Sequence, residues 1–357
     1  MRHHHLLRCR AMPILPSPPR TLRVSGSLVH HRLIRCRGLP IPPRTPGVSG
    51  GRLFSSLPLP PPLQSPREVH VWYLCPDELN NQSQLNMYEE LLSPSERKYA
   101  DSMKATLLRK DVVLSRALLR TTLSRYTDCK IDPRSFEFKK NKFGKPEVLW
   151  PLDDSTAEQP LHFNISHTTS LIACGIAINA HIGIDVEEKK RNTTKNILSL
   201  ARRYFTPSEV DSLAEISDSD AQRKEFLKLW TLKEAYVKAL GMGFSGAPFS
   251  TFSIMLEISK GIRISKVYIF NLSLLLLSLT YATSNTSRPG CDHLSENWLF
   301  TLAELNSSHY MSVCIEDSSR SQGPEDSPAS VGLKVWKTVP FVEDTLVSGT
   351  EAVKLIA

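Results

Sequence analysis

The alternation of apolar and polar residues predicts several β-strands in the middle and C-terminal parts of the chain. In Gly183-Ile184-Asp185-Val186-Glu187, acidic residues alternate with apolar ones, so an extended strand would place Asp185 and Glu187 on one face. Residues 171–178 form a continuous apolar run, typical of a buried strand. Residues 298–302 and 309–315 predict a pair of strands that returns to the same region.

Two segments carry the signature of a helix N-terminus. Residues 93–96 read Ser-Pro-Ser-Glu and residues 206–209 read Thr-Pro-Ser-Glu, which is a capping box with proline at the first helical position. An amphipathic helix is expected after each. Aligning these helices sets Arg116 opposite Glu234 and Arg120 opposite Lys238. The chain is therefore expected to be an α+β protein of two similar lobes, related by a pseudo-twofold axis, with a ligand cleft between them.

The N-terminal segment differs sharply in composition from the rest. The 357-residue chain has a net charge of +8, but residues 1–67 hold eleven arginines, thirteen prolines, no lysine and no acid. The remainder therefore carries a net charge of about −3. We expect an Arg/Pro-rich leader at 1–67, N-terminal and C-terminal lobes at 68–180 and 181–345, and a tail at 346–357. The leader composition is typical of an organelle transit peptide. A disordered, Pro-rich tail, or an untranslated region of the transcript read as protein, would have a similar composition.

An apolar run at residues 267–279 is shorter than the about 20 residues that a membrane-spanning helix needs, and it contains Asn271 and two serines. No membrane span is predicted. We interpret this run as a strand with an insertion, near residues 265–290, or as a retained intron, and favour the intron. The seven cysteines show no paired spacing, which indicates free thiols rather than a disulfide scaffold.

Three carboxylates and a lysine carry the candidate chemistry. Asp185 and Glu187 share a strand face, while Glu234 and Lys238 lie one helical turn apart. Magnesium binds through a few carboxylates together with phosphate oxygens, and a lysine ammonium suits phosphate. Each element alone has a simpler explanation, because a Glu-to-Lys pair is usually a surface pair and an acidic strand end is usually a solvated turn.

The chain resembles the 4'-phosphopantetheinyl transferases of the large monomeric, carrier-protein-activating type. Four segments in order carry the resemblance, which spans residues 70 to about 255. They are Phe143-Gly144-Lys145-Pro146, Phe163-Asn164-Ile165-Ser166-His167, Gly183-Ile184-Asp185-Val186-Glu187 and Trp230-Thr231-Leu232-Lys233-Glu234-Ala235-Tyr236-Val237-Lys238-Ala239-Leu240-Gly241. The resemblance implies the two-lobed fold of that family and transfer of phosphopantetheine from coenzyme A to a serine of an acyl carrier protein, releasing adenosine 3',5'-bisphosphate.

Site residues follow from the same resemblance. Mg²⁺ would be held by Asp185, Glu187 and Glu234, with Glu234 and Lys238 as the catalytic pair. Coenzyme A would be bound by Lys140, Lys142, Gly144, Lys145, Asn164, Ser166 and His167. Outside this context the lysine-rich segment would be a solvated hairpin, and His167 a structural histidine. Tyr99 stands where relatives place a basic residue for the adenosine phosphate, which leaves Arg97 or Lys98 as substitutes.

Two other functions stay open at this point. One is a disabled homologue that binds coenzyme A or a carrier protein without turnover. The other is an interaction protein whose basic leader binds nucleic acid or an anionic surface, although the leader lacks interleaved aromatic residues. We expect a monomeric, mitochondrial, magnesium-dependent enzyme that binds no nucleic acid and no membrane, with plastid and cytosol as alternative locations.

Overall fold

The computed structural model describes residues 59–150, 161–191, 196–258, 265–271, 298–317 and 331–356. The helices are α2 (Gln82–Glu89), α3 (Pro94–Asp101), α4 (Thr106–Arg125), α5 (Ile197–Tyr204), α6 (Pro207–Ala214), α7 (Ser219–Leu240) and α8 (Gly243–Gly246). The strands are β1 (Glu68–Leu74), β2 (Glu137–Lys140), β3 (Pro146–Leu149), β4 (Leu161–His167), β5 (Ile172–Ile178), β6 (Ile182–Glu188), β7 (Phe252–Ile258), β8 (Ser265–Asn271), β9 (Trp298–Leu305), β10 (His309–Glu316), β11 (Gly332–Val339), β12 (Glu343–Leu346) and β13 (Val353–Leu355).

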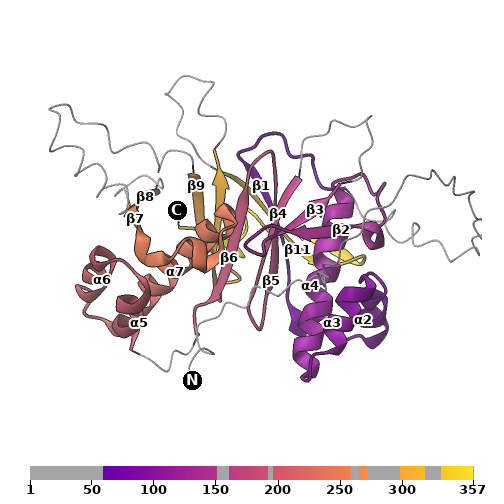
Figure 1. The fold of residues 1–357 in the computed structure, drawn as a ribbon, viewed down its shortest axis with the longest axis horizontal. Helices are drawn as coiled ribbons and strands as arrows, with labels where there is room; N and C mark the ends of the chain where they lie inside the picture. The colour runs from indigo at the N-terminus through magenta and orange to yellow at the C-terminus, as the bar shows by residue number, and fades with distance from the viewer. Residues whose placement is uncertain are drawn as a thin grey trace, which may run out of the picture.

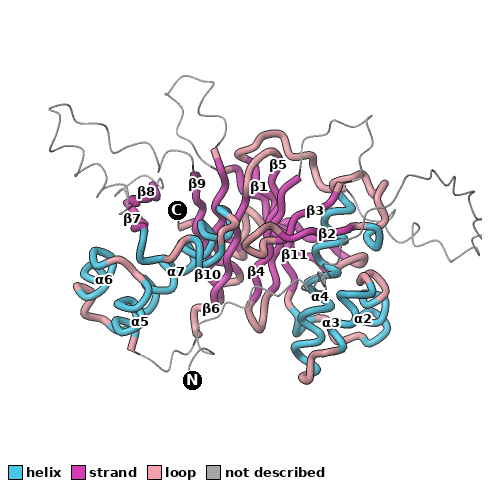
Figure 2. The backbone as a smooth tube through the Cα atoms, viewed as in Figure 1, coloured by secondary structure: helices cyan, strands magenta, loops and turns pink. Residues whose placement is uncertain are grey.

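Two sheets form the centre of the molecule (Figure 1). The first has five strands in the order β12-β11-β1-β5-β4, and the second has four in the order β13-β9-β10-β6. Neighbouring strands are antiparallel except β1 and β11, which are parallel. Two hairpins, β2–β3 and β7–β8, stand apart from these sheets. Helices α2, α3 and α4 lie at one end of the molecule, and α5 and α6 at the other (Figure 2).

Three groups of buried apolar residues hold the layers together. Leu114 and Leu118 of α4 pack with Trp72 of the first sheet. Ile184 and Val313 of the second sheet pack with residues of the first, so the two sheets face one another. Trp230 of α7 belongs to a third group, which covers the other side of the second sheet. Burying each such side chain contributes about 1.5–3 kcal/mol. The chain is a mixed helix and sheet protein of the predicted α+β class.

Several local predictions are confirmed. Both capping boxes are present, at Ser93 with Glu96 and at Thr206 with Glu209. The predicted return of strands appears as the antiparallel pair β9 and β10. The cysteines among the described residues are all free thiols. Within the same residues, none of the helices combines the length and the apolar character needed to cross a bilayer.

The C-terminal part of the chain departs from the predicted division. Strand β11 leaves the predicted second lobe and pairs in parallel with β1 of the first sheet. Strand β13, inside the predicted tail, pairs with β9. The predicted boundary between the second lobe and the tail, at residue 345, therefore does not coincide with a boundary between the two sheets. Each strand belongs to the sheet in which it finds its partner, and that partner can lie far away in the chain. Residues 1–58 of the leader and 272–290 of the expected insertion lie outside the described residues.

Candidate active site

The site is built where the edges of the two sheets meet. Strand β4 is the last strand of the first sheet and β6 is the last strand of the second. The backbone N–H of Ile184 donates to Asn164 Oδ1 at 2.9 Å, and that of Val186 donates to Ser166 Oγ at 3.2 Å. Asn164 and Ser166 therefore satisfy backbone groups of β6 that have no strand partner on this side.

Asp185 lies at the centre of this junction and is fully buried. Its Oδ1 accepts a hydrogen bond from Ser166 Oγ at 2.9 Å and lies 2.6 Å from the Lys238 ammonium. Lys238 Nζ also contacts Ser166 Oγ at 3.0 Å and the carbonyl of Ile184 at 3.1 Å. Three residues predicted separately from sequence therefore form one hydrogen-bonded cluster.

Gly183 brings α7 close enough to β6 for this contact. A Cβ at residue 183 would stand 1.9 Å from the carbonyl oxygen of Ala235 and 2.4 Å from the backbone nitrogen of Ala239. Both distances are far inside van der Waals contact, so only glycine allows the helix to lie directly on the strand. This close packing carries Lys238 to Asp185.

The other two predicted metal ligands lie beside this cluster. Glu187 is buried, and both of its carboxylate oxygens accept from Arg191 Nη1, at 2.7 and 2.6 Å. Burial raises the pKa of Glu234, and repulsion from Asp185 and Glu187 adds to the rise while Lys238 opposes it. Burial also raises the pKa of Asp185, against the attraction of Lys238. The site therefore concentrates negative charge that its cations offset only in part.

The donor set suits a hard divalent cation. Asp185 Oδ2 is buried and has no hydrogen-bond partner in the described part of the chain, which is a costly state for a carboxylate oxygen. Asp185, Glu187 and Glu234 all offer the oxygen ligands that magnesium prefers. Among the described residues, however, no three acidic, histidine or cysteine side chains stand in a ready-made metal cluster. Instead, Lys238 forms an ion pair with Asp185, and Arg191 forms one with Glu187.

The β2–β3 hairpin carries the predicted coenzyme A residues of the first lobe. Gly144 adopts a positive φ of 96° at its turn, a conformation that glycine reaches without steric strain. Lys145 Nζ donates to the carbonyls of Ile182 and Ala239, at 2.9 and 3.2 Å, and burial lowers its pKa to about 8. Lys145 thus joins the hairpin to β6 and α7, and its role at a phosphate stays a prediction.

The remaining predicted residues lie around this hairpin and at the end of β4. Lys140 is half-buried on β2, and the exposed Lys142 lies over the ring of Phe143, 4.9 Å from its centroid. His167 is half-buried and is the last residue of β4. Within the described residues, neither Lys140 nor Lys142 forms a hydrogen bond or ion pair with the Asp185 cluster. Their part in binding coenzyme A also stays a prediction.

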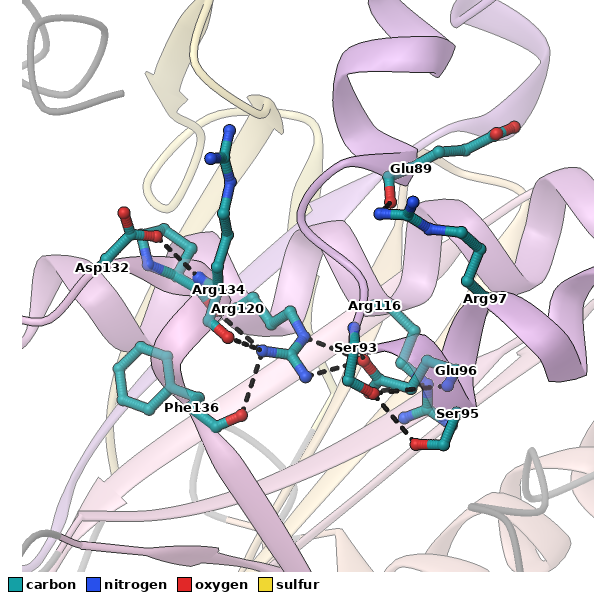
Figure 3. Close-up of polar contacts among 11 residues, drawn as sticks. Glu89, Ser93, Ser95, Glu96, Arg97, Arg116, Arg120, Asp132, Arg134 and Phe136 are labelled. Carbon is teal, nitrogen blue, oxygen red and sulfur yellow. Dashed lines mark hydrogen bonds and ion pairs between the residues drawn. The ribbon is translucent and has the colours of Figure 1, made fainter. Parts of the chain in front are cut away.

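Sequence reasoning missed two residues that position the site. Asn141 donates from Nδ2 to the carbonyl of Gly241 at 2.8 Å, which fixes the hairpin against the end of α7. Lys233, directly before Glu234, is fully buried and lies 2.9 Å from Glu209 Oε1. It also donates to the carbonyl of Phe249 at 2.8 Å, and burial lowers its pKa to about 8. The spacing is the signal in the sequence that could have identified Lys233. Lys233 follows the capping glutamate Glu209 by 24 positions, just as Arg120 follows the capping glutamate Glu96 (Figure 3).

Comparison with known proteins finds similarity to one superfamily. The family model described as "4'-phosphopantetheinyl transferase superfamily" matches residues 181–286. The chain is 35% identical over 190 residues to the 4'-phosphopantetheinyl transferase HetI of Nostoc sp., covering 53% of this chain and 76% of that protein. It is 32% identical over 145 residues to the 4'-phosphopantetheinyl transferase Sfp of Bacillus subtilis, covering 41% of this chain and 58% of that protein.

A vertebrate relative is more distant but matches a longer stretch than Sfp does. The L-aminoadipate-semialdehyde dehydrogenase-phosphopantetheinyl transferase of Xenopus laevis is 23% identical over 210 residues, covering 57% of this chain and 62% of that protein. The family match includes Asp185 and Lys238 of the sheet junction and the neighbouring carboxylates Glu187 and Glu234. The chain therefore belongs to the 4'-phosphopantetheinyl transferase superfamily.

Proposed function

We propose that this protein transfers the 4'-phosphopantetheine group of coenzyme A to a serine hydroxyl of an acyl carrier protein. The serine oxygen attacks the β-phosphorus of the coenzyme A diphosphate, and the bond to the bridging oxygen breaks. Adenosine 3',5'-bisphosphate leaves with the electron pair of that bond. The observation that carries the proposal is the Ser166–Asp185–Lys238 cluster beside Glu234, with one oxygen of Asp185 left unsatisfied.

Glu234 is the residue that we assign to the proton of the serine hydroxyl. Its carboxylate stands beside Lys238 and Asp185, where a positioned carboxylate can accept that proton as general base. Lys238 lies at the same junction and carries the charge needed to stabilise the diphosphate as negative charge moves to the leaving group. Asp185 holds Lys238 in place through the 2.6 Å contact with its ammonium.

We further propose that the enzyme requires Mg²⁺, held by Asp185, Glu187 and Glu234. The bound ion would neutralise charge on the diphosphate and on the leaving phosphate. The unpaired Asp185 Oδ2 supports the assignment, because a cation supplies the partner that this oxygen lacks. Asp185 can offer Oδ2 while Lys238 stays on Oδ1, whereas both oxygens of Glu187 are held by Arg191, which would have to release Glu187 at least in part.

The lobes are proposed to be diverged copies related by a pseudo-twofold axis. Two matching contacts support this relation: Arg120 pairs with the capping glutamate Glu96, and Lys233 pairs with the capping glutamate Glu209, each 24 positions further along the chain. This correspondence sets Arg120 opposite Lys233 rather than Lys238. The proposed alignment of α4 with α7 therefore differs by five positions from the alignment expected from sequence, which set Arg120 opposite Lys238.

A transfer assay with a lysine variant and a matched control tests the function. Lys238→Met removes the ammonium at the junction, while Lys224→Met removes a half-exposed lysine of the same helix that pairs with Asp220. We expect Lys238→Met to lower turnover on an apo acyl carrier protein by about 10²-fold or more, the scale seen when one charge-stabilising group is lost. Lys224→Met should keep full turnover. Equal activity in both variants would remove Lys238 from the mechanism.

We propose in addition that the Arg-rich segment 1–67 directs the protein to mitochondria. Its eleven arginines and lack of acidic residues support import, which favours positive charge. Fusing residues 1–67 to a fluorescent protein tests the assignment. Mitochondrial fluorescence is expected, and a plastid or cytosolic signal would contradict it.

A further inference from the structure

A group of polar side chains lies at the rim between the two sheets. His309, the first residue of β10, is only 3% exposed. It stands opposite Glu188 of β6 in the antiparallel ladder, so the two side chains share one face of the second sheet. On that same face, Val186 and Met311 pack against the first sheet. His309 and Glu188 therefore face the first sheet, on the side of β6 opposite to Asp185.

The turn that joins β4 to β5 meets this pair. Thr169 and Ser170 both donate from their hydroxyl groups to Glu188 Oε1, each at 2.7 Å. The ring nitrogen Nε2 of His309 lies 3.0 Å from Thr168 Oγ1 and 3.1 Å from Ser170 Oγ. All three hydroxyl groups of the turn therefore contact the second sheet.

The direction of these hydrogen bonds follows from the donors that are present. An ionised carboxylate can only accept, so the single proton of Ser170 Oγ is used on Glu188. The same hydroxyl can then meet His309 only as an acceptor, which requires a proton on Nε2. Nδ1, on the other side of the ring, lies 2.8 Å from Ser308 Oγ. The ring is held through both nitrogens, and His309 donates to Ser170, which donates to Glu188.

His167, the last residue of β4, stands directly before this turn. On its other side, Ser166 Oγ donates to Asp185 Oδ1 at 2.9 Å. Strand β4 is therefore tied to β6 just before His167, and the turn is tied to β6 and β10 just after it. Anchors on both sides hold the backbone of His167 in one place relative to the Asp185 cluster.

We propose that His309 is a positioning residue for the binding of coenzyme A, an inference that rests on the proposed function. His309 acts by holding the turn at residues 168–170, and with it His167. It makes no contact with the substrate and transfers no proton. A ligand that meets an already ordered side chain loses less conformational entropy on binding, so the hydrogen bonds of the turn contribute to affinity. Without the imidazole, the turn keeps only its contacts with Glu188.

Titration calorimetry with coenzyme A, without magnesium or carrier protein, tests the inference. We expect His309→Leu to weaken the affinity about tenfold, the order of effect of one lost hydrogen bond in a network that ends on a charge. Ser170→Ala removes the hydroxyl shared by His309 and Glu188 and should weaken the affinity to a similar extent; Ser170 is half-buried, so this variant should fold. His309→Gln keeps an N–H donor in place of Nε2 and should restore most of the affinity.

Ile315→Val is the control for a loss of stability alone. Ile315 lies in the core at the other end of β10, away from the turn, so the shorter side chain destabilises the fold without changing any contact of His309. This variant should bind coenzyme A as tightly as the wild type does.

A double-mutant cycle shows whether His309 acts through His167. His167→Ala should weaken the affinity, and adding His309→Leu to it should cause no further loss, because the side chain that His309 positions is already absent. Equal losses from His309→Leu in both backgrounds, or wild-type affinity in His167→Ala, would overturn the inference while the proposed function stands. Wild-type affinity in both His309→Leu and Ser170→Ala would overturn it as well. A wild-type protein that binds no coenzyme A would overturn the proposed function and the inference together.

Discussion

Replacing Glu234 by glutamine should stabilise the metal-free protein, even though it removes a residue essential for the proposed activity. Burial raises the pKa of Glu234 from its ordinary 4.5 to about 7, with repulsion from Asp185 and Glu187 contributing. A carboxyl group whose pKa is higher in the folded state binds its proton more tightly there. Wild-type stability from this group is therefore fully present below pH 4.5 and is lost as the pH rises towards 7.

The size of the effect follows from the shift. Each unit of pKa difference corresponds to about 1.4 kcal/mol, so the full shift would correspond to about 3 kcal/mol. Glu234 keeps some solvent contact, and the repulsion that contributes to its shift is shared with Asp185. We therefore expect Glu234→Gln to raise the free energy of unfolding by about 1–2 kcal/mol at pH 8, with almost no change at pH 4.5.

Urea denaturation followed by tryptophan fluorescence, in EDTA and across pH 4.5 to 8, measures this difference. Glu225→Gln provides the control, since Glu225 lies on the same helix in a surface pair with Lys228. That variant should change stability by less than about 0.5 kcal/mol at any pH. A Glu234→Gln protein that is no more stable than the wild type at pH 8 would refute the view that uncompensated negative charge is stored at this site.

Three further predictions concern the same region. Gly183→Ala should lower the free energy of unfolding by at least the upper end of the roughly 1–3 kcal/mol typical of overpacking, because the added Cβ would meet the backbone of α7. Urea denaturation measures this loss. Gly332→Ala is the control and should be tolerated, because its Cβ would have no contact closer than 3.8 Å. Lys233→Met should lower the free energy of unfolding by about 3–5 kcal/mol, since it leaves Glu209 buried without its cation; Lys224→Met should not. Asp185→Asn should abolish magnesium binding in calorimetric titrations, and wild-type affinity should fall as the pH drops, because protonation of Asp185 and Glu234 competes with the metal. Unchanged magnesium affinity in Asp185→Asn would exclude it as a ligand.

Local sequence patterns predicted the elements that hold the site. The alternation around Asp185 and Glu187 became strand β6, and the capping boxes became the starts of α3 and α6. These features depend on residues close together in the chain, so their physical causes are visible in sequence. The helix turn that separates Glu234 from Lys238 is equally local.

Contacts between distant segments could not be predicted in the same way. The parallel pairing of β11 with β1 joins segments more than 250 positions apart, and no periodicity marks it. The lysines illustrate the same limit: Lys238 reaches a carboxylate, Lys233 a buried glutamate, and Lys145 two backbone carbonyls. Composition cannot distinguish these environments, because each depends on which strand or helix packs against the lysine.

The central claim is tested most directly by the mass of a purified apo acyl carrier protein after incubation with this enzyme, coenzyme A and magnesium. We predict a gain of roughly 340 Da, the mass of the phosphopantetheinyl group, which disappears in EDTA and with the Asp185→Asn variant. A folded wild-type protein that adds no mass to either of two different carrier proteins would contradict the assignment.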